Sequence, residues 1–151
     1  MTLQLGNDQG DWSPVGTRFT RNYHSSCHAA PVPDYIELCN YLNVRIAYLI
    51  RGLMDRDDPA VPGTKMIDNT VVYFVTDMGN GRSHSAENGP NIIATGMPGF
   101  RKWTATKGGN NRHVIDTVTV GMGLEQFMGT DKNRHKIWPH GGGTIASDML
   151  A

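Results

Sequence analysis

Imidazole side chains are the groups in this sequence best suited to bind a metal ion. His24 and His28 lie four residues apart, His84 follows Asp77 by seven residues, and His113 begins a later hydrophobic segment. Imidazole and carboxylate together suit zinc, iron or manganese, and such ligands are often gathered from several loops at a sheet edge. The alternative is that the histidines are solvated or hydrogen-bonded loop residues. Asp77 could likewise accept amide bonds of the glycine-rich turn that follows it.

Other motifs that suggest chemistry are incomplete. Gly79-Asn80-Gly81 lacks the third glycine of a dinucleotide-binding loop, because His84 stands where that glycine is due. Gly141-Gly142-Gly143-Thr144 lacks the lysine and the spacing of a P-loop. Cys27 precedes His28, but no cysteine stands three residues earlier, so the haem-attachment motif is absent and only a cysteine–histidine nucleophile stays open. We therefore expect neither a nucleotide nor haem as a cofactor.

The elements that must position these residues are indicated by hydrophobic spacing. From Asp34 to Met54, apolar residues recur at three- and four-residue steps, which predicts an amphipathic helix with Asp34 as its cap. The uninterrupted apolar run at 71–76 predicts a strand covered on both faces, as in the middle of an α/β sheet. A second, shorter strand is expected at 91–96. Asp77 would then lie at a strand end, where ligands gather in open α/β sheets.

The remaining segments have weaker patterns. Residues 1–33 show no sustained period and predict an irregular arm, so we expect the segment around His24 and His28 to be non-helical. Residues 114–122 fit a helix or a strand, and propensity slightly favours the strand. A short terminal helix is expected from Ile145 to Leu150.

Composition limits the class of protein. The chain has 151 residues, enough for one core, and its 18 glycines and 8 prolines predict many loops. The charges of fourteen basic and fourteen acidic residues cancel, which disfavours nonspecific electrostatic binding of nucleic acid. The basic clusters that contain tryptophan are therefore interpreted as solvated surface. No apolar run approaches the roughly 20 residues of a membrane helix, and the first ten residues do not resemble a secretory signal. Such a loop-rich chain is expected to depend on a metal, a partner or the remainder of a larger fold.

The segment from Asp68 to Ser85, DNTVVYFVTDMGNGRSHS, is similar to the most distinctive stretch of a bacterial family, domain of unknown function 1552. That family is related to the sulfatase-like family 1501. The motif YHSSCH at Tyr23–His28 resembles the family's histidine- and serine-rich motif before a long helix, and Asn111-Arg112-His113 resembles a histidine that opens a later helix. The resemblance extends over about residues 18–151. On this resemblance, rather than on propensity, we expect residues 114–122 to be helical.

The resemblance implies a fold of the alkaline phosphatase and sulfatase superfamily, in which helices flank a central sheet. Residues 34–151 would form the C-terminal part of this α/β fold, preceded by the irregular arm at 1–33. The superfamily holds one or two divalent metal ions, and the resemblance implies that the ligands are His24, His28, Asp77 and His113. His84 would be an auxiliary ligand or a general acid. Superfamily members commonly have a histidine directly after the strand-end aspartate, where this chain has Met78, so either His84 substitutes for it or a second metal is absent.

The implied activity is metal-dependent hydrolysis of phosphate or sulfate esters. The nucleophile and a further acidic ligand of the superfamily lie in an N-terminal half that 151 residues do not contain. We therefore expect another protein chain, or a homo-oligomer, to complete the site, and the resemblance implies a periplasmic or cell-envelope origin. The alternative is a noncatalytic structural or interaction subunit of a larger assembly, which uses the helix face and the arm and keeps the histidines as hydrogen-bonding anchors.

Overall fold

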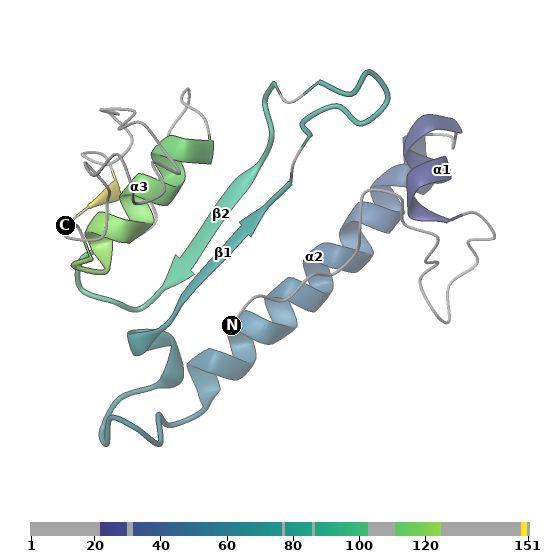
Figure 1. Ribbon diagram of the computed structural model, residues 1–151. Helices are drawn as coiled ribbons and strands as arrows, with labels where there is room; N and C mark the ends of the chain where they lie inside the picture. The colour runs from purple at the N-terminus through teal and green to yellow at the C-terminus, as the bar shows by residue number, and fades with distance from the viewer. Residues whose placement is uncertain are drawn as a thin grey trace. The chain divides into compact units, whose positions relative to one another are not determined.

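The computed structural model describes residues 22–29, 32–76, 78–85, 87–102, 111–124 and 149–150. The chain is a mixed α/β protein (Figure 1) whose elements are α1 (Tyr23–Ala29), α2 (Val32–Asp55), the 3₁₀ helix η1 (Met66–Asn69), β1 (Val71–Val75), β2 (Asn91–Thr95) and α3 (Asn111–Gly121). It divides into two compact units, the first formed by Met1–Gly52 with Thr76–Gly89 and the second by Leu53–Val75 with Pro90–Ala151. Within the described residues, the helices are too short or too polar to cross a membrane.

Helix α1 begins at a side-chain cap. Asn22 Oδ1 accepts a hydrogen bond of 2.7 Å from the Ser25 amide, and this bond satisfies a donor that the first turn of a helix leaves unpaired. The buried Ser26 hydroxyl donates to the Asn22 carbonyl at 2.9 Å. The prediction of a non-helical segment here is therefore wrong. Its physical consequence is that His24 and His28, four residues apart, share one face of a helix.

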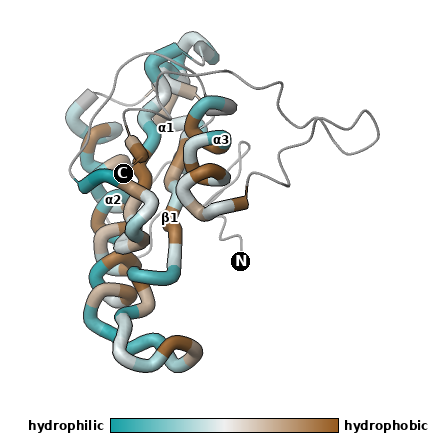
Figure 2. The backbone as a smooth tube through the Cα atoms, turned by 90° about the vertical axis from the view of Figure 1, so that its left-hand side faces the viewer, coloured by the Kyte–Doolittle hydropathy of each residue, from teal (hydrophilic) through white to brown (hydrophobic). Residues whose placement is uncertain are grey.

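Helix α2 confirms the amphipathic helix predicted from Asp34 to Met54. Leu38 and Ile46, eight residues apart, are buried, and Figure 2 shows hydrophobic and hydrophilic residues alternating along the turns of α2. The helix begins at Val32, before the predicted cap, so Asp34 lies in the first turn, where a carboxylate is favourable to the helix dipole.

Aromatic side chains join α1 to α2 within the first unit. The rings of Tyr23 on α1 and Tyr35 on α2 have centroids 6.2 Å apart. Burial raises the pKa of the Tyr35 hydroxyl, and the neighbouring Tyr23 raises it further. Burial also raises the pKa of the Cys39 thiol, one turn further along α2. Both shifts follow from the partial burial of these two side chains.

Strands β1 and β2 pair antiparallel, with Val71 opposite Thr95 and Val75 opposite Asn91. The Tyr73 hydroxyl donates to Asn91 Oδ1 at 2.6 Å, and burial raises the pKa of this tyrosine. The two strands were predicted at 71–76 and 91–96. The expectation of full cover on both faces is wrong for β1 as described, because none of its five residues is buried and Val75 is 38% exposed. A two-stranded sheet is marginal alone, so its stability depends on packing against other elements.

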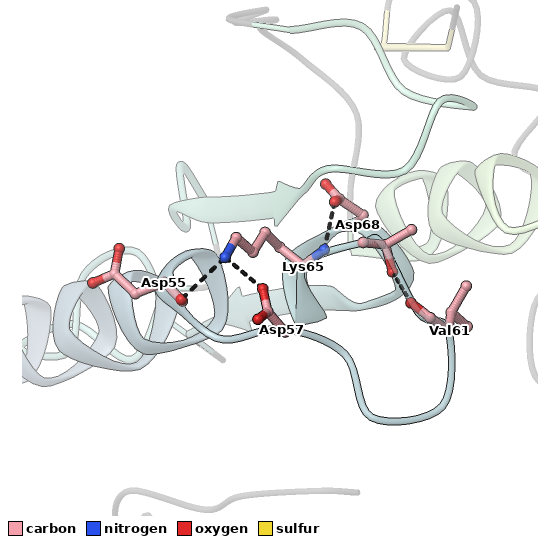
Figure 3. Close-up of polar contacts among 6 residues, drawn as sticks. Asp55, Asp57, Val61, Lys65 and Asp68 are labelled. Carbon is pink, nitrogen blue, oxygen red and sulfur yellow. Dashed lines mark hydrogen bonds and ion pairs between the residues drawn. The ribbon is translucent and has the colours of Figure 1, made fainter.

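The turn between α2 and β1 is fixed by Lys65 (Figure 3). Its ammonium donates to Asp57 Oδ1 at 2.6 Å and to the Asp55 carbonyl at 3.4 Å, while its backbone amide donates to Asp68 Oδ2 at 2.9 Å. The hydrogen bond and the charge of Asp57 raise the pKa of Lys65. One side chain therefore ties the end of α2 to the start of η1.

Asp58 adds two further hydrogen bonds to the same turn. Its Oδ1 accepts a hydrogen bond of 2.8 Å from the Ala60 amide, and its Oδ2 accepts one of 2.9 Å from Asn69 Nδ2. These bonds favour the ionised carboxylate, so the pKa of Asp58 is lowered, first by Ala60 and then by Asn69. Gly63 has φ 87°, a left-handed conformation that glycine adopts without a steric cost.

Helix α3 confirms the helix expected from the resemblance and not the strand slightly favoured by propensity. Thr117 is fully buried, and its hydroxyl donates to the His113 carbonyl at 2.7 Å; the Thr119 hydroxyl donates to the Ile115 carbonyl at 2.9 Å. These bonds satisfy the threonine hydroxyls inside the helix and so remove the cost of burying them.

Phe100 packs against the end of α3. A Cβ atom built on Gly121 would overlap the Phe100 ring, so only glycine allows this approach. Phe100 is buried and forms an isolated β-bridge with Leu150. The terminal helix expected from Ile145 to Leu150 lies outside the described residues except for Met149 and Leu150.

Candidate metal site

Two of the candidate histidines come from α1. The rings of His24 and His28 have centroids 4.8 Å apart and meet edge to face at 60°. Both side chains are exposed. The four-residue spacing, together with the Asn22 cap that starts the helix, is the local reason that these rings are neighbours.

The third histidine comes from a tight loop between β1 and β2. Asn80 and Ser85 bond to each other through both of their backbone groups at 3.1 Å. Asn80 Oδ1 accepts hydrogen bonds from the amides of Arg82 at 3.1 Å and Ser83 at 3.3 Å, which is the local bonding that makes asparagine a turn residue. His84 has φ 53°, a left-handed conformation uncommon for residues other than glycine. The loop holds His84 in this conformation.

The loop lies directly on α1, and in Figure 1 it extends toward that helix. A Cβ atom built on Gly81 would overlap Cys27 Sγ, so the loop backbone contacts the cysteine at a place where only glycine fits. Arg82 Nε donates a hydrogen bond of 3.3 Å to the Cys27 carbonyl. Both contacts involve the residue just before His28, so they bring the loop to this histidine.

The outcome is a direct pair of imidazoles from the two chain segments of the first unit. His28 Nε2 and His84 Nε2 lie 3.2 Å apart, and the ring centroids lie 5.0 Å apart at an interplanar angle of 67°. One neutral ring can donate to the other, with the tautomer deciding which. Two imidazole nitrogens bound to one tetrahedral zinc at about 2.0–2.1 Å would be separated by about 3.3–3.4 Å. The observed separation therefore suits either a hydrogen bond or a shared cation.

The predicted site residues are only partly brought together. His28 contacts both His24 and His84, whereas Asp77 lies outside the described residues and His113 lies on α3 in the second unit. Within the described part of the chain, no three histidine, cysteine, aspartate or glutamate side chains form a group that could hold one ion. The described geometry thus offers two ligands. His28 forms the close pair with His84, in addition to its ring contact with His24 on the same helix.

The sequence interpretation did not find the residues that position the pair. Asn80 and Gly81 were considered as part of an incomplete dinucleotide motif or a glycine-rich turn, and Arg82 only as part of the stretch that resembles the family. The signal that indicates a tight turn is Asn80 itself, since an asparagine followed by glycine often bonds the amides two and three residues later. The contact of Gly81 with Cys27 has no local signal, because the two residues are 54 positions apart in the sequence.

Comparisons of this chain with protein-family models, curated proteins and solved structures find no match.

Proposed function

We propose that this chain binds a divalent metal ion through His28 and His84 and forms part of a hydrolase that acts on phosphate or sulfate esters. The single observation that carries the metal site is the 3.2 Å separation of the two Nε2 atoms. The reaction class rests on the resemblance of the loop sequence to the sulfatase-like families. The same resemblance supports the proposal that the mixed α/β chain is part of an alkaline-phosphatase-like fold.

The exposure of the pair fits a catalytic rather than a purely structural metal site. His28 and His84 are both exposed, and catalytic metal sites keep coordination positions open to water or substrate. Asp77 immediately precedes the loop in the sequence, and the resemblance implies it as a further ligand. A bound ion would lower the pKa of a water molecule or polarise an ester oxygen.

The pairing favours one of the two roles open to His84. As a general acid acting through Nε2, His84 would need this nitrogen near the leaving group, whereas it lies beside His28 Nε2. We therefore assign His84 as a ligand. His24, whose ring contacts His28, lies next to the pair, where it is placed to accept a proton.

Metal analysis of the full chain tests the proposal. We expect about one equivalent of zinc, iron or manganese, and at least a tenfold lower affinity for His28→Gln and for His84→Asn. Asparagine tolerates the left-handed backbone, so the second variant removes the imidazole with little strain. His135→Gln is the matched control, and His113→Gln tests the ligand that the resemblance adds. Absence of metal after loading with each ion, or unchanged affinity in both pair variants, would contradict the proposal.

A second candidate function is supported by α2. Val44 and Tyr48 are 62% and 76% exposed, and Ile36, on the same helix, is 53% exposed. Glu37 is seven positions before Val44 and Arg51 is seven positions after it. An antiparallel second copy of this helix, centred on Val44, would therefore place Glu37 of one copy near Arg51 of the other. The alternative is therefore an interaction subunit that forms a homodimer through α2.

Sedimentation of Val44→Asp and Tyr48→Asp separates the two candidate functions. A dimer that becomes a monomer in both variants, in a chain that binds no metal, would support the interaction subunit. A monomer at all concentrations would remove it.

A further inference from the structure

We infer that Asn80 is a site of deamidation, the hydrolysis of its side-chain amide by water, and that the isoaspartate formed there separates His84 from His28. The inference goes beyond the proposed function, because it concerns the two imidazoles whether or not they hold a metal ion. Asn80 and Asn88 are the two asparagines of this chain that glycine follows. Because glycine has no Cβ atom, its amide nitrogen can approach the preceding side chain closely.

The reaction needs only Asn80, Gly81 and water. The Gly81 nitrogen attacks Cγ of Asn80, the bond from Cγ to Nδ2 breaks, and ammonia leaves with the proton that the Gly81 nitrogen gives up. Water then opens the succinimide ring that has formed. If the new bond to Cγ breaks, aspartate results. If the bond from the Gly81 nitrogen to the main-chain carbonyl carbon breaks, isoaspartate results, and the backbone then runs through the side chain of residue 80.

Asn80 is exposed to water, but the loop of residues 78–85 holds it away from the reaction. Its Oδ1 accepts hydrogen bonds from the amides of Arg82 at 3.1 Å and Ser83 at 3.3 Å. Its backbone N–H and carbonyl both bond to Ser85 at 3.1 Å. These bonds oppose the rotation that brings the Gly81 nitrogen to Cγ. Deamidation therefore proceeds from the fraction of chains in which the loop is open.

The two products differ in their effect on the loop. An aspartate side chain keeps an oxygen that accepts the two amides, and its charge strengthens these bonds. Isoaspartate inserts one more carbon–carbon bond, of about 1.5 Å, into the backbone before Gly81. Gly81 fits so closely against Cys27 that a Cβ atom built on it would overlap Cys27 Sγ. A displacement of one bond length therefore either overlaps the sulfur or loses the contact, and in both cases the loop carries His84 away from His28.

The test follows modification and loop release in one sample. The full chain is kept metal-free with a chelator and incubated at neutral pH, and the deamidated fraction is separated by ion exchange. Fragmentation mass spectrometry assigns isoaspartate to position 80, and the rate at which a thiol reagent labels Cys27 reports release of the loop. We expect the fraction that contains isoaspartate to label Cys27 about tenfold faster than the unmodified chain. Cys39, on α2, should label at an unchanged rate in both.

Two variants are matched controls. Asn80→Asp has the same change of charge without the longer backbone, so it should label Cys27 within about twofold of the parent. Asn88→Gly removes the other asparagine–glycine pair at a position with φ 57°, where glycine fits without strain, and should leave the effect of Asn80 unchanged.

Three results would overturn the inference. Asn80 could stay unmodified in the folded chain, isoaspartate at position 80 could leave the labelling of Cys27 unchanged, or Asn80→Asp could label Cys27 as fast as the isoaspartate form does. The last result would mean that charge, and not backbone length, releases the loop. These results leave the metal proposal standing, because all of these measurements are made without metal.

Discussion

The contact between Gly81 and Cys27 allows a quantitative test of how the loop positions His84. Gly81→Ala places a Cβ atom where it overlaps Cys27 Sγ. The backbone of Gly81 is not in the left-handed region, so alanine adds no conformational strain there. The only direct effect of the substitution is therefore the overlap, which pushes the loop away from α1 and separates His84 from His28.

The size of the effect follows from the cost of overpacking. An extra methyl group in a close contact costs about 1–3 kcal/mol. If this cost falls on the conformation in which the two imidazoles meet, metal affinity decreases by about 5- to 150-fold, since 1.4 kcal/mol corresponds to a factor of ten. The global unfolding temperature should change less, because the loop can move without disrupting α2.

Removal of the sulfur should rescue the variant. After Cys27→Ala, the nearest remaining atom of residue 27 to the new methyl group is the Cβ atom, at 3.6 Å, which is ordinary van der Waals contact. The Gly81→Ala, Cys27→Ala double variant is therefore expected to recover most of the metal affinity. The assay is zinc competition against a chromophoric chelator for the parent, both single variants and the double variant, with Ser83→Ala as a control in the same loop.

The four affinities form a double-mutant cycle, and its coupling energy measures the contact. A Gly81→Ala variant that binds zinc within twofold of the parent would refute the packing argument. So would a double variant as weak as Gly81→Ala alone, because the loss would then arise from something other than the sulfur.

Three further predictions concern the stability of the chain. The metal-free His84→Asn variant should have a higher free energy of unfolding than His84→Ala, because asparagine tolerates φ 53° better than alanine. Urea denaturation of both variants without metal tests this, and equal midpoints would contradict it. Gly121→Ala should destabilise the second unit by about 1–3 kcal/mol through overlap with the Phe100 ring, measured by thermal unfolding, and an unchanged midpoint would contradict the packing of this ring. Because the pKa of Asp58 is lowered in the folded chain, its carboxylate stabilises the fold above pH 3.8, and this stabilisation is lost as the pH falls through the lowered pKa. Because the pKa of Lys65 is raised, its ammonium stabilises the fold below pH 10.5, and this stabilisation is lost as the pH rises through the raised pKa. Urea midpoints measured across pH should therefore decrease at both ends, and Asp58→Asn should flatten only the acid side.

The elements with a strong local pattern were predicted correctly from the sequence. Helix α2 has an apolar stripe over six turns, and β1 and β2 have continuous apolar or β-branched runs, so their identity follows from nearby residues. Helix α1 was missed because it has only seven residues, and its stability depends on the Asn22 cap and on packing against Tyr35 rather than on a hydrophobic stripe.

The site was predicted only at the level of residue type. The sequence indicated His24, His28 and His84 as ligands or helpers, but not that His28 and His84 form the close pair. Their contact depends on Gly81 meeting Cys27 and on Arg82 reaching a backbone carbonyl of α1, and such non-local contacts leave no periodic signal. For α3, propensity slightly favoured a strand because threonine and valine are common in strands, while hydrogen bonds inside the helix satisfy the buried hydroxyl of Thr117.

The separation of His28 and His84 along the chain has a consequence for folding. The two histidines are 56 positions apart, and the polypeptide leaves the first unit and returns to it within that span. An ion held by both imidazoles would act as a cross-link that closes this long circuit, and the chain-entropy relation for a cross-link of that length gives about 4 kcal/mol. The concentration of the metal ion would then determine how often the two segments that carry His28 and His84 separate. Backbone amides of these segments would exchange their hydrogens more slowly as that concentration rises.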